Sequence, residues 1–249
     1  MPAEDARDLP RRVAVVAHRG APRIARENTL PSLRAALALG AEWVEVDVRL
    51  ARCGTPVLLH DATLHRLWAV PRAAAELDAA ELFALGHEPA DGVPTLREGL
   101  RLCAQAGVTV MVDVPGPAEG TASLAVVDEL GLLDRCVFAG EQTALERIRA
   151  AAPQARIALS WESFLPPGAG LLTRVRPQYL NVEHHRLTRP LVAFARRRGL
   201  AVSTWTVDRP ARVATVARLG ADVVISNEPA LALAALARPG GVGAAVRTS

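Results

Sequence analysis

The sequence predicts one (β/α)8 barrel, also called a TIM barrel, over residues 1–249. Short apolar runs rich in β-branched residues alternate with alanine- and leucine-rich segments of helical period along almost the whole chain. This alternation is typical of a parallel sheet covered by helices. The length of 249 residues matches the roughly 250 residues of such a barrel. Polar residues also stand at the ends of the first apolar runs, where α/β folds carry their chemistry.

The elements follow in order along the chain. Strands are expected at 13–17, 43–50, 57–60, 108–114, 136–140, 155–161, 179–183, 200–207 and 222–226. Helices are expected at 29–39, 94–106, 121–133, 142–152, 188–198 and 210–219. Four of these helices are followed by a glycine, a residue that commonly ends a helix: Gly40, Gly107, Gly199 and Gly220.

The predicted strands are one too many for the barrel, and their spacing explains the surplus. Only residues 51–56 separate the second run from the third, whereas a parallel crossover needs about a dozen residues or more. The third run is therefore expected to fold back as a hairpin, which returns His60 towards the second strand. Residues 61–93 are expected to form an inserted loop or small subdomain, and residues 240–249 a frayed tail.

Composition limits the function classes. The chain has 29 basic residues against 26 acidic ones, and the basic triplet 196–198 ends a helical segment, where cations favour the helix dipole. No stretch approaches the roughly 18 to 20 apolar residues of a membrane span, and the charged residues 1–12 argue against a leader. The three cysteines lack disulfide or zinc spacing. We expect a cytoplasmic protein with no nucleic-acid partner and no stable membrane anchor, and nothing indicates its oligomeric state.

All 29 basic residues are arginine, because the chain contains no lysine. A Schiff base is therefore excluded. Any bound anion must be held by arginine, backbone N–H groups or a metal.

Histidines and acidic residues gather in the first quarter of the chain. His18 and Arg19 follow the first run, Glu45 and Asp47 lie within the second, and His60 closes the third. Carboxylates at i and i+2 project from one face of a strand, and such a pair is unfavourable unless a cation lies between them. The set supplies the parts for metal-assisted acid/base chemistry on an anionic substrate.

Several motifs in the same order resemble the glycerophosphodiester phosphodiesterase family. They are His18-Arg19-Gly20, Glu27-Asn28-Thr29-Leu30, residues 40–48, residues 56–61, residues 93–96, Trp205-Thr206-Val207 and residues 220–225. The resemblance covers most of the chain. It implies a barrel with its site at the carboxyl ends of the strands, and an essential divalent cation, Mg²⁺ or Ca²⁺, with Mn²⁺ as a further candidate.

The resemblance also implies roles for individual residues. His18 and His60 correspond to the family's general acid/base pair, and Arg19 to its phosphate contact. Glu45 and Asp47 correspond to metal ligands. Carboxylate oxygens are hard ligands suited to Mg²⁺ or Ca²⁺, and a phosphodiester needs its charge neutralised before a hydroxyl or water attacks.

The chain departs from the family pattern at two places. The family has a Glu-x-Lys pair where this chain has Asp113-Val114-Pro115. Asp113 is expected to complete the metal site with a carboxylate one methylene shorter, and Pro115 removes the lysine contact to the phosphate. The family's Thr-Asp pair after the last strand has become Ser226-Asn227.

Three further places are interpreted with an alternative beside each. Glu27 is expected to shape the loop around His18 and the substrate side of the site, with helix capping as the alternative. Trp205 is expected to wall the substrate pocket, with core packing as the alternative. His184 and His185 end the seventh strand, where alternation would send them to opposite faces, so that at most one faces the pocket.

The predicted function is a divalent-metal-dependent phosphodiesterase that cleaves a glycerophosphodiester-like small phosphodiester to a phosphomonoester and an alcohol. Two alternatives stay open at this point. One is a divergent enzyme acting on a sugar- or nucleoside-linked phosphodiester in specialised metabolism. The other is a catalytically silent metal-binding barrel.

Overall fold

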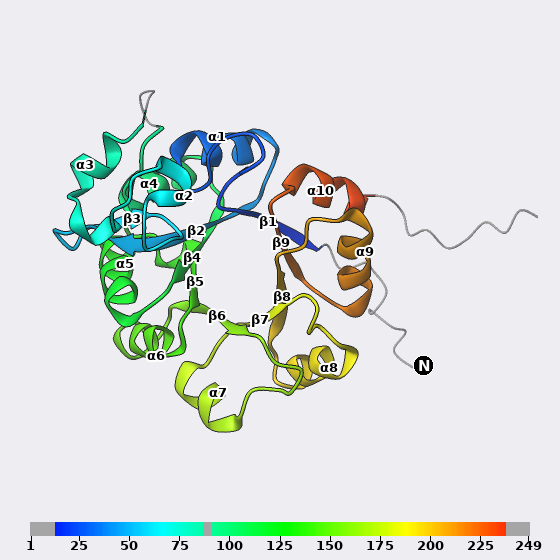
Figure 1. Cartoon of the computed structure of the whole chain (residues 1–249). Coiled ribbons are helices and arrows are strands. Elements are labelled where there is room, and N and C mark those ends of the chain that lie inside the picture. Colours follow the sequence, from blue (N-terminus) through cyan, green and yellow to red (C-terminus); the bar gives the residue numbers. More distant parts are fainter. Residues whose placement is uncertain (1–12, 87–90, 238–249) are drawn as a thin grey trace, which may run out of the picture.

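The computed structural model describes residues 13–86 and 91–237. Its sheet has the strand order β1-β9-β8-β7-β6-β5-β4-β2-β3, and a further pairing of β1 with β2 closes it into a barrel (Figure 1). The barrel strands are β1 Ala14–His18, β2 Trp43–Leu50, β4 Thr109–Val114, β5 Cys136–Gly140, β6 Arg156–Trp161, β7 Tyr179–Glu183, β8 Ala201–Trp205 and β9 Val223–Ser226. All eight run parallel. The predicted TIM barrel is confirmed.

The surplus strand, β3 Pro56–Leu58, pairs antiparallel with β2, so the predicted hairpin is confirmed. Gly54 has φ 78° in its turn, a conformation that costs glycine little. Beyond β3, the Leu59 N–H donates to the Asp47 carbonyl oxygen over 3.0 Å. This bond holds the next residue, His60, beside the carboxyl end of β2.

Helices surround the barrel. They are α1 Leu30–Ala38, α4 Leu96–Gln105, α5 Pro117–Glu129, α6 Gln142–Ala151, α7 Ala169–Val175, α8 Arg189–Arg197, α9 Pro210–Leu219 and α10 Pro229–Ala237, with a 3₁₀ turn, Leu133–Arg135, after α5. Six correspond to predicted helices, and α5 begins earlier than predicted because Pro117 favours the first helical position. Helices α7 and α10 were not predicted. The residues of α7 form under two turns, and α10 is apolar on every side, so neither shows an amphipathic period.

The insertion predicted at 61–93 is a small subdomain in its described part. It contains α2 His65–Trp68, a 3₁₀ turn Ala74–Glu76 and α3 Ala79–Phe83. Leu64, Leu77, Leu82 and Val93 are buried in an apolar cluster that the insertion shares with Val57 and Leu59 of the hairpin. The expected leaderless start at 1–12 and the tail at 240–249 lie outside the described residues. Within the described ranges, no helix is long and apolar enough to cross a membrane.

The interior of the barrel changes character along its axis. Val16, Met111 and Ile225 are buried in an apolar cluster formed by residues of several strands. Successive inward-facing residues lie two apart on a strand, so the next inward position after Val16 is His18 and the next after Met111 is Asp113. The apolar core therefore forms the floor beneath the polar side chains at the carboxyl ends of the strands.

Candidate functional site

A pocket of about 210 Å³ opens at the carboxyl ends of the strands. Its lining comprises His18, Arg19, Glu45, Asp47, Val48, Arg49, His60, Met111, Asp113, Pro115, Asn181, Trp205 and Ile225. The barrel thus brings together every predicted site residue except Glu27, which reaches the pocket indirectly by binding Arg19. Trp205 does wall the pocket, and its indole Nε1 donates to the backbone carbonyl oxygen of Asn181 over 3.3 Å.

Strand register explains why the acidic residues meet. His18 of β1 lies opposite Glu45 of β2, and Asp47 of β2 lies opposite Asp113 of β4. Neighbouring residues in register on parallel strands point the same way, so these side chains all face inward. Glu45 and Asp47 are only 4% and 9% exposed. Burying charged carboxylates this deeply is costly unless partners neutralise them.

Loss of contact with water shifts the pKa values of the carboxyl groups in the pocket. Loss of water, then the neighbouring charges of Asp47 and Asp113, raise the pKa of Glu45 well above its usual value. Burial, and next the charge of Asp47, raise the pKa of Asp113 to about 7. A cation bound among the three carboxylates would relieve this repulsion. Their hard oxygen atoms therefore suit Mg²⁺ or Ca²⁺ in charge and in chemistry.

Arg19 lies inside this acidic group. Its backbone N–H donates to Glu45 Oε2 over 3.0 Å, and its NH1 donates to Glu27 Oε1 over 2.9 Å. Its Nε is 3.0 Å from Asp47 Oδ2. Asn28 contacts the same oxygen, with Nδ2 donating to Asp47 Oδ2 over 2.7 Å. Glu27 therefore orients Arg19 rather than capping α1, whose N-cap is Thr29.

The two histidines have different partners. His18 Nδ1 is 2.8 Å from Asn227 Oδ1, and its Nε2 is 3.8 Å from Glu45 Oε2. Burial, and then the charge of Arg19, lower the pKa of His18. His60 Nδ1 is instead 2.7 Å from Asp61 Oδ1, and its side chain is 46% exposed. The His18 side chain, 16% exposed, thus contacts an amide, whereas the more exposed His60 contacts a carboxylate.

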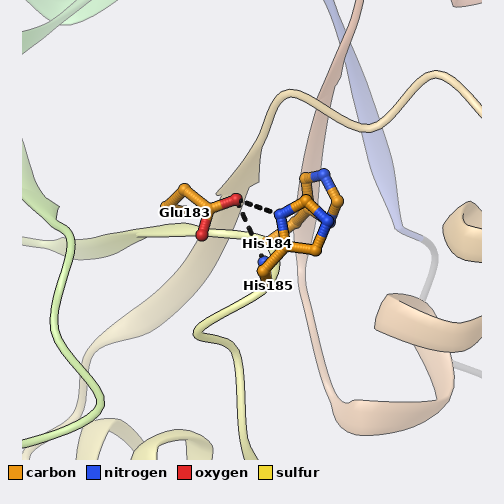
Figure 2. A group of neighbouring side chains, drawn as sticks. All are labelled: Glu183, His184 and His185. Atoms are coloured by element: carbon orange, nitrogen blue, oxygen red, sulfur yellow. Dashed lines mark hydrogen bonds and ion pairs between the residues drawn. The ribbon is translucent and has the colours of Figure 1, made fainter.

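A second group of metal-ligating side chains lies at the end of β7 (Figure 2). Glu183, His184 and His185 each offer a ligand atom within 4.8 Å of the others, and they could hold a metal ion. Among the described residues, only this group has three ligand atoms that all lie within 4.8 Å of one another. The carboxylates of Glu45, Asp47 and Asp113 do not meet that limit.

The prediction that His184 and His185 point to opposite faces is wrong. Their ring centroids are 3.8 Å apart, because both residues lie in a turn after β7, where strand alternation has ended. Arginines already occupy this group. Arg212 Nε is 3.1 Å from His184 Nδ1, and Arg186 NH1 donates to Glu183 Oε2 over 2.9 Å. Two neighbouring guanidinium groups oppose the binding of a cation here.

Two polar residues that line the pocket, Arg49 and Asn181, were not predicted from the sequence. Arg49 stands two residues after Asp47 on the same face of β2, and its Nε donates to the His60 carbonyl oxygen over 2.8 Å. Asn181, 3% exposed, accepts a bond from Ser203 Oγ over 2.9 Å. The two-residue period that revealed Glu45 and Asp47 would have revealed Arg49. Nothing local to Asn181 distinguishes it from a buried structural amide.

Known proteins share the sequence family and the fold of this chain. The model of the glycerophosphoryl diester phosphodiesterase family matches residues 18–231. A glycerophosphodiester phosphodiesterase of Caldanaerobacter subterraneus subsp. tengcongensis is 25% identical over 245 residues, which cover 91% of this chain and 98% of the relative. Human glycerophosphodiester phosphodiesterase 1 is 34% identical over 116 residues, 43% of this chain and 35% of the relative.

Solved structures agree. A phosphodiesterase of Oleispira antarctica, in complex with the product sn-glycerol-3-phosphate, has a TM-score of 0.82 and 25% identity, covering 90% of this chain and 97% of its own. A structure from Silicibacter pomeroyi has a TM-score of 0.81 at 24% identity, covering 92% and 94%, and shows the shared fold. The fold and site are those of a barrel phosphodiesterase. The chain belongs to the glycerophosphoryl diester phosphodiesterase family and is a phosphoric diester hydrolase.

Proposed function

We propose that the chain hydrolyses a small glycerophosphodiester to a phosphomonoester and an alcohol, with His18 and His60 as the acid/base pair. The observation that carries the proposal is the pocket itself, which both histidines and the carboxylates of Glu45, Asp47 and Asp113 line. The relative from Oleispira antarctica with bound sn-glycerol-3-phosphate supports a phosphomonoester product.

Glu45, Asp47 and Asp113 are the proposed ligands of a divalent cation, Mg²⁺ or Ca²⁺, with Mn²⁺ as a further candidate. Three carboxylates on adjacent strands support this role: those of Glu45 and Asp47 are buried, and the pKa values of Glu45 and Asp113 are raised. A bound cation would neutralise the charge of the phosphodiester and so lower the barrier to attack. The shorter side chain of Asp113 leaves more room than the family's Glu.

The protein's own residues bind the substrate and move protons. Arg49 lines the pocket and supplies the second cation that the missing lysine would have provided, beside Arg19. Arginine suits this task because its planar guanidinium can bind a phosphate through two parallel hydrogen bonds. One histidine accepts the proton of the attacking hydroxyl or water, and the other donates a proton to the departing alkoxide. Trp205 closes one wall around the alcohol.

Hydrolysis assays test this proposal. Glycerophosphocholine, glycerophosphoethanolamine and bis(4-nitrophenyl) phosphate are offered with Mg²⁺, Mn²⁺, Ca²⁺ or EDTA. We expect turnover that requires the cation and falls by on the order of 10² or more in His18→Ala. His65→Ala is the matched control, since His65 is exposed on α2. Full activity in EDTA, or in His18→Ala, would refute the mechanism.

A divergent substrate is the second candidate, and Pro115 favours it. This residue lines the pocket where the family has lysine, so this part of the wall is apolar and donates no hydrogen bond. A sugar- or nucleoside-linked phosphodiester would place an uncharged ring there. Metal-dependent cleavage of such substrates with higher kcat/KM than glycerophosphocholine would establish it, and Pro115→Lys should shift the preference back.

We also propose that the protein is located in the cytoplasm. Cys53, Cys103 and Cys136 are free thiols, which is usual in a reducing compartment. We also propose that the protein binds no nucleic acid, because its 29 basic residues are nearly balanced by 26 acidic ones.

A further inference from the structure

The contacts of His18 continue into two loops near the other end of the chain, those after β8 and β9. His18 ends β1, and Asn227 directly follows β9. The pairing of Ala17 with Ser226 places the two strand ends next to each other. Asn227 Oδ1 is 2.8 Å from His18 Nδ1, and Asn227 Nδ2 is 2.9 Å from Asp208 Oδ2. His18, Asn227 and Asp208 thus form one hydrogen-bonded chain.

Asp208 determines which way the Asn227 side chain faces. A carboxylate accepts hydrogen bonds and donates none. Asp208 accepts from the Asn227 backbone N–H over 2.8 Å, from Asn227 Nδ2 over 2.9 Å and from Ser226 Oγ over 3.3 Å. The NH₂ group of Asn227 must therefore point to Asp208, and its carbonyl oxygen to His18. Because that oxygen only accepts, the proton between it and His18 belongs to Nδ1.

We propose that Asp208 and Asn227 are positioning residues that hold neutral His18 as the Nδ1–H tautomer, with the lone pair of Nε2 facing the pocket. The proposal rests on the acid/base role proposed for His18. Only a nitrogen with a lone pair can take the proton of an attacking hydroxyl or water. That proton forms a bond to Nε2 while the freed oxygen pair forms the bond to phosphorus. The bond from phosphorus to the departing alkoxide breaks, and that oxygen takes a proton from His60. The Nδ1–H bond of His18 to Asn227 stays in place throughout.

The amide gives His18 a setting unlike that of His60. His60 contacts the carboxylate of Asp61 directly, and a carboxylate there stabilises the protonated ring. In the chain from His18 the negative charge lies one residue further away, on Asp208. Asn227 therefore fixes the orientation of the ring without placing a charge against it. This arrangement gives a structural reason for Asn227 at a position where the family pattern has aspartate.

The first measurement uses the unmodified protein. The ¹⁵N chemical shifts of labelled histidine, recorded at about pH 8, above the ordinary histidine pKa of roughly 6.5, tell a protonated ring nitrogen from an unprotonated one. Comparison with His18→Gln assigns the signals. We expect His18 to be protonated at Nδ1 and bare at Nε2. The opposite tautomer would overturn the proposal, whether or not the enzyme is active.

Asp208→Asn tests the role of the carboxylate. The new amide can take the Asn227 backbone N–H with its oxygen, and it then presents NH₂ to the Asn227 side chain. Asn227 must turn its own NH₂ towards His18, which moves the ring proton to Nε2. We expect the histidine signals to change accordingly and kcat to fall by on the order of 10²-fold, with little change in KM.

Exchanging the carboxylate and the amide between positions 208 and 227 should restore both the His18 tautomer and kcat. In Asp208→Asn with Asn227→Asp, the carboxylate at 227 accepts from His18 Nδ1 and from the amide at 208, so the Nδ1–H tautomer returns. We expect kcat to recover to within about tenfold of the unmodified protein. If Asp208→Asn acted only by loosening the packing, adding Asn227→Asp would not restore kcat.

Glu228→Gln is the matched control, because this carboxylate is next to Asn227 but pairs with Arg23. We expect it to leave the tautomer and kcat unchanged. The proposal fails if Asp208→Asn keeps the Nδ1–H tautomer, or if the exchanged pair stays as slow as Asp208→Asn. Failure of the phosphodiesterase proposal is seen separately, as no metal-dependent turnover by the unmodified protein.

Discussion

Arg19 and Arg49 are the two arginines that line the pocket, and the chain contains no lysine. Arg19 is already engaged by Glu27 and Asp47 at 2.9 and 3.0 Å. Arg49 is bound through its Nε to a backbone oxygen, which orients its guanidinium without neutralising its charge. Arg49 is thus the better placed of the two to meet a new anion.

Arg49→Gln is expected to raise KM for glycerophosphocholine by about tenfold or more, since a hydrogen bond to a charged group contributes roughly 1.5 to 3 kcal/mol. The value of kcat should change less. Steady-state kinetics measure both. Arg174→Gln, which removes a guanidinium paired with Glu146 outside the pocket, should leave KM unchanged. An unaltered KM in Arg49→Gln would mean that Arg49 does not contact the substrate.

Gly20 shows how a single backbone position supports the site. Its φ is 87°, and a Cβ there would lie 2.5 Å from Ser32 Oγ and 2.6 Å from the Ser32 carbonyl carbon. The Arg19 carbonyl accepts from Ser32 Oγ over 2.9 Å. The close approach of this loop to α1 therefore sets the position of Arg19 and His18.

Gly20→Ala should destabilise the protein by about 2 to 4 kcal/mol, from the positive φ together with overpacking. Gly54→Ala is the matched control. Its φ is 78° with nothing within 4 Å of a new Cβ, so only the conformational cost of about 1 to 2 kcal/mol remains. Urea unfolding measures both. Equal losses of unfolding free energy in the two variants would show that the close approach of Ser32 does not oppose a Cβ at residue 20.

The inserted segment after β3 helps to build the active face. Arg66 of α2 donates to Asp61 Oδ2 over 2.6 Å and to Glu27 Oε1 over 2.6 Å. Asp61 contacts His60, and Glu27 contacts Arg19. One arginine of the insertion therefore connects the loop of one histidine to the loop of the other. The insertion therefore helps to hold His60 and Arg19, two residues that line the pocket.

Arg66→Met tests this link through acid stability. The bond from Arg66 is the largest cause that lowers the pKa of Asp61, to about 2. A carboxyl whose pKa is lower in the folded state stabilises the fold above its unfolded pKa of about 3.9, and loses that effect as pH falls through about 2.

We therefore expect Arg66→Met to be less stable than the unmodified protein above about pH 4. The difference should shrink as the pH is lowered towards 2. Urea unfolding at a series of pH values measures it. Arg72→Met, which removes an exposed ion pair with Glu76 in the same segment, is the control. A difference that does not depend on pH would contradict the link to Asp61.

The closed barrel as a whole places the carboxylates of Glu45, Asp47 and Asp113 in one pocket, so the proposed cation would bind the folded protein and not the unfolded chain. A ligand that binds only the folded state stabilises it, by about 2.7 kcal/mol at a hundred times its Kd. Excess Mg²⁺ or Ca²⁺ should therefore raise Tm, and EDTA should reverse the rise.

Two variants distinguish the candidate cation sites. Asp113→Asn should abolish the metal-dependent rise in Tm, because it removes a proposed ligand. Glu183→Gln should keep it, because Arg186 and Arg212 surround that group. A rise that survives Asp113→Asn and disappears in Glu183→Gln would assign the ion to the group at the end of β7.

Most of the fold could be predicted because strands and amphipathic helices leave local periods in the sequence. The hairpin of β2 and β3 followed from the length of its connection alone. Helices α7 and α10 left no such signal, since one is short and the other is apolar throughout. Polar residues on the face of a predicted strand could also be identified, and Arg49 would have been found by the same rule.

Residue types and strand order are local properties, and the sequence by itself determined the barrel, the hairpin and the chemistry of the first quarter. The tertiary structure decided which groups meet. His18 and Asn227 lie 209 residues apart, and they come within hydrogen-bond distance only because β9 pairs with β1. The facing of the Asn227 amide depends in turn on Asp208, in a third loop. Such contacts arise from closure of the barrel, and no local period in the sequence records them.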